Sequence, residues 1–172
     1  MLFRSDWFAY NLKDGNDDLS LRPFLYLLQK SKEVAIGDEQ YLQYAEKSKT
    51  ILGAKYFAGF QAMEHIGKEY YEELEKEKGN EGLILLRDFL RNPNSNIQRK
   101  GTYTFYEFQQ LIAAFIREKK EDLKKIELDN SQNIIIFLKN NGIIRERREK
   151  GGERTYYEIP FLYKYYLLFD NA

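Results

Sequence analysis

The sequence contains no cysteine and only one histidine among its 172 residues. The absence of cysteine excludes a disulfide framework, a thiolate nucleophile and a cysteine-ligated metal site. A single histidine likewise excludes metal sites that are built from several imidazoles. With 43% hydrophobic and 16% aromatic residues, the chain has enough apolar mass to form a core without such cross-links. Because cysteine is absent and histidine occurs once, we expect no bound metal, and we also expect no cofactor.

Long apolar runs are absent as well. No segment approaches the roughly 18 to 20 apolar residues that span a bilayer, so we expect no membrane partner. Residues 1–8 lack the basic and apolar regions of a signal peptide, which predicts cytoplasmic residence. This aromatic segment runs directly into the polar loop 13–18. We interpret residues 1–8 either as the truncation point of a longer protein or as an ordinary N-terminal strand or helix.

There is no excess of charge of either sign, because 27 Lys and Arg offset 27 Asp and Glu. Overall charge therefore gives no attraction to nucleic acid or to a membrane. The distribution is nevertheless uneven. Residues 99–154 carry 13 basic and 9 acidic side chains, whereas residues 1–98 carry 13 basic and 16 acidic ones. The C-terminal part is thus mildly basic.

Apolar residues recur at helical spacing through the N-terminal part of the chain. Ser20 is a good N-cap, Pro23 is tolerated in the first turn, and Gly37 is a plausible stop, so a first helix is predicted between Ser20 and Gly37. Further helices are predicted over 39–48, 50–78 and 81–91, followed by a linker at 92–96.

The longest of these predicted helices, 50–78, has one continuous apolar face. Its inward residues are Leu52, Tyr56, Phe60, Met63, Ile66, Tyr70 and Leu74. Gly53, Gly59 and Gly67 each weaken it by roughly 1 kcal/mol relative to alanine. These glycines either allow close helix packing or mark a break.

The last third of the chain changes from helical to extended patterning. Thr104 and Glu107 form a capping box at the start of a helix, and a second helix is predicted over 131–141, capped by Asn130 or Ser131. Two consecutive glycines further on predict a tight turn. The strands on either side of that turn are predicted over 143–148 and 154–159, and a final aromatic segment covers 161–169.

These patterns predict a mainly α protein. Residues 1–96 are expected to form a helical bundle, and residues 97–172 a winged-helix-like domain with a small β-hairpin. A helix that leads directly into a charged hairpin with glycines at its tip is typical of a winged helix.

The predicted hairpin carries most of the basic residues that nucleic acid could contact. The candidates for nucleic-acid binding are Lys139, Arg145, Arg147, Arg148, Lys150 and Arg154. Glu146, Glu149 and Glu153 alternate with them, so cross-strand ion pairs are the alternative interpretation. The helix over 131–141 offers amides but no arginine for guanine. Its apolar character is more typical of a helix packed between other helices.

Aromatic residues suggest a second kind of nucleic-acid contact, stacking on unpaired bases. Most of the 12 Phe and 14 Tyr side chains fall at core spacing, which favours packing. Tyr103, Tyr156 and Tyr157 are the rings that we expect to be most exposed.

No pattern of catalytic residues is present. The sequence has no phosphate-binding loop and no dinucleotide fingerprint. His65 has only Glu69 at helical spacing, which makes neither a metal site nor a catalytic constellation. Glu72, Glu73 and Glu75 lie among lysines at a polar helix end, so we expect them to be solvated and not suited to acid–base chemistry. An autonomous enzyme is therefore not expected.

Several segments together carry a family resemblance. They are Leu21-Arg22-Pro23 opening a helix, the long helix 51–77, the helices within 105–115 and 131–144, and the closing stretch 156–166. In this order they resemble the C-terminal region of bacterial P-loop ATPases of the AAA+ and STAND groups, some of which occur in phage-defence systems. In that family an Arg-Pro-led lid helix precedes a helical bundle and a winged helix. The resemblance implies that Arg22 approaches a nucleotide held by another domain.

Two departures from the family pattern limit what the resemblance implies. The lid motif of the family often continues with Arg-Asp, where this chain has Phe24 and Leu25. The nucleotide-binding core is absent altogether. The resemblance therefore implies a fragment or a stand-alone relative that does not hydrolyse ATP by itself.

The sequence as a whole predicts a non-enzymatic regulatory or interaction module. Its expected partners are another protein or the missing ATPase core, and DNA contacted through the basic wing. The alternative is a stand-alone winged-helix transcriptional regulator that binds DNA.

Overall fold

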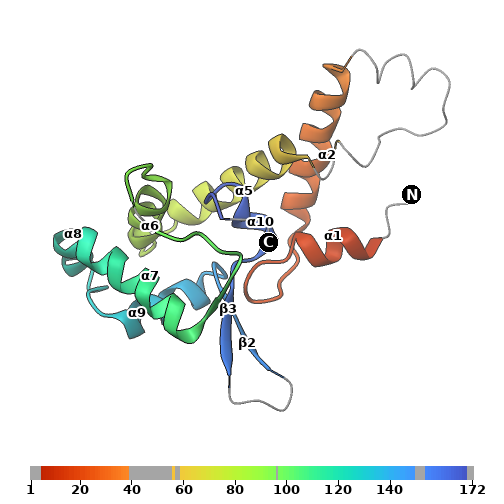
Figure 1. Ribbon diagram of the computed structural model, residues 1–172. Coiled ribbons are helices and arrows are strands. Elements are labelled where there is room, and N and C mark those ends of the chain that lie inside the picture. The colour runs from red at the N-terminus through yellow and green to blue at the C-terminus, as the bar shows by residue number, and fades with distance from the viewer. Residues whose placement is uncertain (1–4, 39–55, 57–58, 96, 150–153, 170–172) are drawn as a thin grey trace.

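Helices surround a small antiparallel sheet in this protein (Figure 1). The computed structural model describes residues 5–38, 56, 59–95, 97–149 and 154–169. The described helices are α1 (Ser5–Asn11), α2 (Leu21–Ile36), α5 (Phe60–Glu75), α6 (Glu81–Arg91), α7 (Phe105–Glu118), α8 (Lys120–Lys125), α9 (Ser131–Asn140) and α10 (Phe161–Lys164). The described strands are β1 (Thr102–Thr104), β2 (Arg145–Arg148) and β3 (Thr155–Glu158). The predicted mainly α fold with a small β-hairpin region is confirmed.

Local capping residues set where several helices begin. The Ser20 hydroxyl accepts a hydrogen bond from the backbone N–H of Arg22 at the start of α2. At the start of α7, Thr104 and Glu107 form the complete capping box. The Asn130 side chain accepts a hydrogen bond of 2.8 Å from the backbone N–H of Asn133 in the first turn of α9. Each such cap is worth about 1 kcal/mol, and all three starts were predicted from sequence.

The predicted long helix over 50–78 is interrupted. Tyr56 is helical, but Gly59 has extended backbone and precedes the first residue of α5, so Gly59 marks a break. Gly67 instead allows close packing, because a Cβ there would lie 2.6 Å from the carbonyl oxygen of Leu162 in α10. The helix predicted over 39–48, as well as Gly53, lies outside the described residues.

The three strands pair in the order β1–β3–β2, all antiparallel. Tyr157 lies opposite Tyr103 and Glu146, and Tyr156 lies opposite Thr104 and Arg147. Since side chains alternate across a strand, the Tyr157 row faces α7, where the Tyr157 ring stacks on that of Phe108 at 4.5 Å. The Tyr156 row faces the other side of the sheet.

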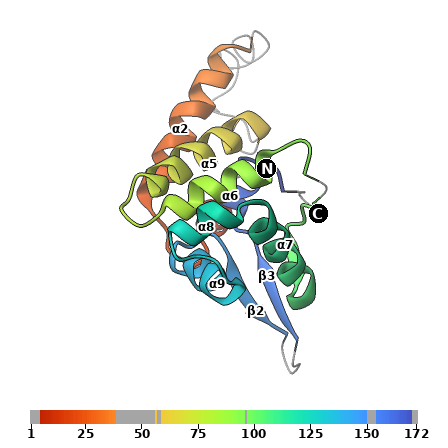
Figure 2. The same cartoon turned by 90° about the vertical axis from the view of Figure 1, so that its left-hand side faces the viewer.

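The β2–β3 hairpin projects away from the body of the molecule, at the opposite end from α2 (Figures 1 and 2). Helix α7 begins beside this hairpin and runs back toward α8 (Figure 2). The first residues of α7 and the base of the β2–β3 hairpin thus lie at the same end of the sheet.

Buried hydrophobic residues form one connected core. The largest fully buried side chains in it are Tyr71, Tyr163, Phe89, Phe108 and Phe115. These residues come from both sides of the domain boundary predicted near residue 96, and α10 returns to pack on α5 (Figure 1). The division into two domains therefore stays a prediction, with α6 and α10 joining its two halves.

Candidate functional site

Arg145 is the one predicted nucleic-acid contact that the fold buries. Only 6% of the residue is exposed. Its guanidinium donates to the backbone carbonyl of Asp14 at 2.6 Å and pairs with the Asp17 carboxylate at 2.9 Å. A second carboxylate, Glu158, lies at 3.8 Å. The assignment of Arg145 to a phosphate contact is wrong, because this charge is already enclosed and compensated.

The cover over Arg145 is the polar loop 13–19, which is closed by a bridge between its two ends. Asp14 holds the loop in shape by accepting hydrogen bonds from the backbone N–H groups of Asn16 and Asp18. Burial raises the pKa of the Asp14 carboxyl group above its usual range. Gly15 comes so close to the start of β2 that an added Cβ would lie 2.3 Å from the Ile144 carbonyl oxygen. The loop is thus fixed against the sheet.

Lys139 is also largely compensated. Its ammonium group donates to the Glu146 carboxylate at 2.6 Å, which ties α9 to β2. This hydrogen bond lowers the pKa of Glu146. Because the pair faces inward from the sheet, Lys139 contributes little free positive charge to a ligand.

Three arginines keep their guanidinium groups in solvent near the wing. Arg147 is 49% exposed and lies 3.4 Å from Glu158, and Arg148 is 80% exposed and lies 3.7 Å from Glu146. Arg154 is exposed, and its side chain has no hydrogen-bond or ion-pair partner in the described part of the chain. We call these three residues the wing arginines. Lys150 lies outside the described residues.

The cross-strand interpretation of the alternating charges holds at some positions, whereas nucleic-acid contact at the others stays a prediction. Cross-strand and helix–strand ion pairs form around Arg145, Lys139 and, more loosely, Arg147. Exposed ion pairs of this kind are typically worth less than about 1 kcal/mol. Arg147 and Arg148 could therefore exchange their carboxylate partners for another anion at little cost, and Arg154 has no such partner to give up within the described residues.

Helix α9 presents a polar, uncharged face. Ile134, Ile135 and Leu138 are buried against the core, as its apolar sequence predicts. The exposed residues on the other side are Gln132, Asn133, Ile136 and Asn140. Asn and Gln side chains suit adenine edges, whereas guanine is read mainly by Arg and Lys.

The exposed aromatic rings are not the predicted ones. Tyr103 and Tyr157 are only 2% and 5% exposed, so the prediction for them is wrong. Near the hairpin, the exposed rings among the described residues are instead Phe105 (53%) and Tyr106 (70%), in the first turn of α7. Tyr106 could have been found from the sequence, because it lies two residues before the inward Phe108 and so falls on the opposite side of the helix.

A groove runs between the first turn of α7 and the start of β3. Its volume is about 450 Å³, and its lining residues are Thr104, Phe105, Tyr106, Arg154, Thr155 and Tyr156. We call it the aromatic groove. Its lining includes a guanidinium group, three rings and two threonine side chains, and no carboxylate.

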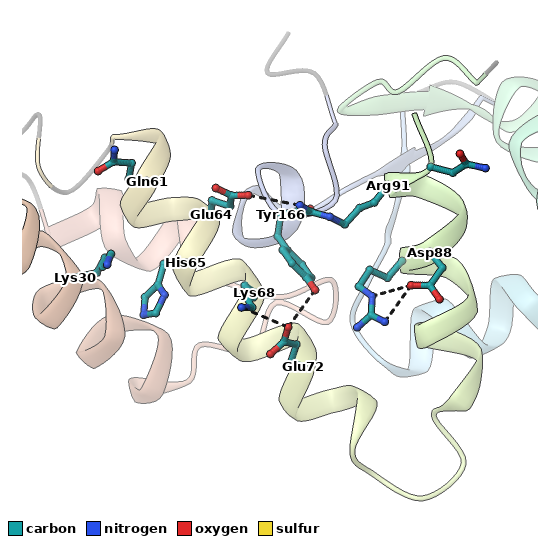
Figure 3. Close-up of a pocket in the computed structure, with 11 residues that line it drawn as sticks. Lys30, Gln61, Glu64, His65, Lys68, Glu72, Asp88, Arg91 and Tyr166 are labelled. Carbon is teal, nitrogen blue, oxygen red and sulfur yellow. Dashed lines mark hydrogen bonds and ion pairs between the residues drawn. The ribbon is translucent and has the colours of Figure 1, made fainter. Parts of the chain in front are cut away.

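A second and larger hollow, of about 840 Å³, lies between α5 and α6, with Lys30 of α2 and Tyr166, which follows α10, also lining it (Figure 3). Its charged side chains largely compensate one another. The pairs are Glu64 with Arg91 at 3.8 Å, Lys68 with Glu72 at 3.9 Å, and Arg87 with Asp88 at 3.0 Å. Such mutual pairing leaves no carboxylate of this hollow desolvated for acid–base chemistry.

His65 lines this hollow, on the side where Lys30 approaches it (Figure 3). The sequence offered Glu69 as its partner, but no hydrogen bond or ion pair joins these two described residues. A histidine beside a lysine, without a carboxylate to orient it, lacks the arrangement of a general base.

Glu75 departs from the expectation that it is solvated. Its side chain is only 8% exposed, and Arg87 from α6 lies 2.6 Å away. Burial raises the pKa of its carboxyl group. The pair joins α5 to α6 beside the buried Tyr71, whose hydroxyl donates to the Leu83 carbonyl. The pair thus contributes to the packing of α5 against α6.

Arg22 is held on the surface of the helical part. Its guanidinium donates to Glu73 at 2.6 Å, and the Tyr26 hydroxyl donates to the same carboxylate at 3.0 Å. This contact links α2 to α5. The Arg22 side chain is still 59% exposed, so part of it remains accessible to a second molecule.

Within the described ranges, no helix is long and apolar enough to cross a bilayer. The same residues contain no group of three or more His, Cys, Asp or Glu side chains that could hold a metal ion. No family model matches the chain, and no curated protein or solved structure matches it significantly. Function therefore has to be argued from the geometry of the wing, the aromatic groove and the hollow.

Proposed function

We propose that this chain is a non-enzymatic winged-helix module that contacts nucleic acid through its wing and so serves a regulatory role in the cytoplasm. The observation that carries the proposal is the order of elements from α6 to β3. A helix and a short strand precede two main helices, and a hairpin follows, with the sheet ordered β1–β3–β2. By position, α9 is the second helix of a helix-turn-helix, the one that enters the major groove in such proteins.

The wing arginines support contact with the phosphate backbone. They lie toward the projecting end of the sheet, and Arg147 and Arg148 lie on opposite faces of β2, so a hairpin inserted into a groove of the duplex could meet phosphates on both sides. Neutralising three phosphates predicts a slope of log K against log[salt] of about −3. This is a shallow slope for a DNA-binding protein, which agrees with a surface that also carries Glu146 and Glu158.

The polar face of α9 supports limited reading of sequence. Gln132, Asn133 and Asn140 can each pair with adenine in the major groove, and no exposed arginine of α9 is present for guanine. We therefore expect a preference for A·T pairs over G·C pairs that is small compared with the phosphate contribution.

The test is a titration of a labelled duplex followed by fluorescence anisotropy at low and physiological salt. Arg147→Ala combined with Arg148→Ala and Arg154→Ala should lower the affinity by about tenfold or more. The matched control is Arg117→Ala with Lys120→Ala and Lys124→Ala, which removes the same charge from exposed positions in the last turn of α7 and in α8. Equal losses in both triple variants, or no binding at low salt, would contradict the proposal.

A second form of the proposal places the module beside a P-loop ATPase core, as the sequence resemblance implies. The partial exposure of Arg22 favours it, because a guanidinium held by Glu73 on one side can still reach a nucleotide in another chain. A phosphate-loop sequence encoded upstream or next to this one would support this form. ATP hydrolysis by the chain alone would contradict both forms.

A further inference from the structure

We propose that the aromatic groove binds an unpaired nucleobase, so that the preferred ligand is a junction between duplex and single strand. The inference rests on the proposed function and names the ligand of the same surface. The wing arginines would contact the duplex backbone, and the first unpaired base would leave the stack and enter the groove.

The first argument is the exposure of the rings. Phe105 and Tyr106 are adjacent residues that keep 53% and 70% of their surface in solvent. Both line a groove of about 450 Å³, a size within the range of about 300–1,000 Å³ that small-molecule sites occupy. Exposed rings in a concave site are the platform on which single-stranded nucleic acid stacks.

The second argument is that part of this platform is rigid. The Phe105 ring lies 6.4 Å from that of Tyr157, which in turn stacks on Phe108 at 4.5 Å. Tyr157 and Phe108 are buried core residues. Phe105 is therefore supported from behind, and a base that stacks on it orders few further side chains.

The third argument is charge, which favours a nucleic acid over a neutral apolar peptide. The groove contains Arg154 and no carboxylate. In the sheet register, Arg147 lies opposite Tyr156 and Arg148 opposite Thr155. Because side chains alternate across a strand, Arg147 lies on the same face of the sheet as Tyr156 and Arg148 lies on the opposite face. Cations are thus present on both faces beside the groove, where an anionic backbone that delivers a base to the rings could meet them.

The acidic residue that follows the two rings in the sequence does not oppose this arrangement. Glu107 follows directly after the two rings, but its carboxylate is held by Lys100 at 2.6 Å and by the backbone N–H of Thr104 at 2.8 Å. Its charge is thereby engaged within the capping box of α7. The uncompensated charge that a ligand meets in the groove is the guanidinium group of Arg154.

The experiment compares three labelled probes at low salt: a blunt duplex, the same duplex with a short thymine overhang, and the single strand alone. We expect the overhang probe to bind about tenfold tighter than the blunt duplex, since one stacked base is worth that order of affinity. Placing 2-aminopurine as the first unpaired base adds a direct readout, because its fluorescence falls when it stacks on a ring.

Tyr106→Ala should abolish the advantage of the overhang and the quenching of 2-aminopurine, while leaving binding of the blunt duplex unchanged. Tyr106→Phe should retain both effects. The matched control is Tyr10→Ala, which removes a tyrosine of similar exposure, 64%, from α1. Thermal unfolding of each variant confirms that the fold is intact.

The outcomes separate this inference from the proposed function. If blunt and overhang probes bind equally and Tyr106→Ala changes neither, the inference is overturned while the proposed function stands. If no probe binds at low salt, both are overturned, and the exposed rings are then assigned to a protein partner.

Discussion

The two ends of strand β2 carry the same type of residue in opposite environments. At its start, Arg145 is enclosed by loop 13–19 and compensated by Asp17. At its end, Arg148 is 80% exposed and only loosely paired. The strand separates them by about 10 Å, at roughly 3.3 Å per residue. What differs is the cover: a loop from the N-terminus lies over one end and leaves the other open.

This difference teaches how a basic hairpin should be interpreted. A count of arginines treats all of them as potential phosphate contacts. In this fold the first arginine, Arg145, is buried under the loop, whereas the last, Arg148, is exposed and accessible to a ligand. We call the Arg145 end of the sheet the pinned end and the wing end the open end, and each prediction below tests this contrast.

The largest effect is expected at the pinned end. Arg145→Ala would leave Asp17, the Asp14 carbonyl and Glu158 without their shared donor. Breaking a fully buried pair costs about 3–5 kcal/mol. Asp17 is 53% exposed and can be rehydrated, so we expect about 2–3 kcal/mol lower free energy of unfolding.

Urea denaturation measures this loss. The matched control at the open end is Arg148→Ala, which should change the free energy of unfolding by no more than about 0.5 kcal/mol. Similar values for the two variants would remove the distinction between pinned and open ends.

Gly15→Ala tests the pinned end by destabilising the loop that covers it. The added Cβ would overlap the carbonyl oxygens of Ile144 and Gly142, and backbone on both sides cannot move aside easily. We expect a loss of about 1–3 kcal/mol, as for other overpacked sites. Gly37→Ala is the control, because its nearest described atoms lie 3.7 Å away and its φ is −75°. Urea denaturation that gives equal effects would show that the loop is not held against the sheet.

Local features of this fold could be predicted from sequence, and distant contacts could not. Ser20, Thr104 and Asn130 cap helices through hydrogen bonds to residues two or three positions away, so a short window contains the whole interaction. The hydrogen bond from Arg145 to Asp14 joins residues 131 positions apart. No local pattern marks such a partner, and the burial of Arg145 followed only from the structure.

The candidate site divides in the same way. The exposed position of Tyr106 follows from the helix phase set by Phe108, so a more careful reading of the sequence would have found it. The burial of Glu75 could not be found in this way, because Arg87 reaches it from a different helix. The groove itself depends on the register that sets Tyr156 beside Thr104, which the sequence does not specify.

The two ends should also respond to acid with opposite sign. At the open end, hydrogen bonds from Lys100 and Thr104 lower the pKa of Glu107 from 4.5 to about 2. Its contribution to stability is therefore complete above about pH 4.5 and is lost as the pH falls toward 2. At the pinned end, burial raises the pKa of Asp14, so protonation of Asp14 favours the folded state.

Denaturation at about pH 6 and about pH 3 tests this sign difference. The stability advantage of the native chain over Glu107→Gln should shrink as the pH falls, and glutamine keeps the capping geometry. Relative to Asp14→Asn, the native chain should instead gain stability as the pH falls. Shifts of the same sign for both variants would contradict the assignment.

The smallest effect is expected within the open end itself, between Arg147 and Arg148. Arg148→Ala should reduce the slope of log K against log[salt] for duplex binding by about 1, the value for one lost phosphate contact. Arg147→Ala should reduce it by less, because Arg147 is half-buried and shares its charge with Glu158 at 3.4 Å. Anisotropy titrations over a range of salt measure both slopes. Equal reductions would mean that Glu158 gives up Arg147 when a duplex binds, which would move the limit of the open end one residue closer to Arg145.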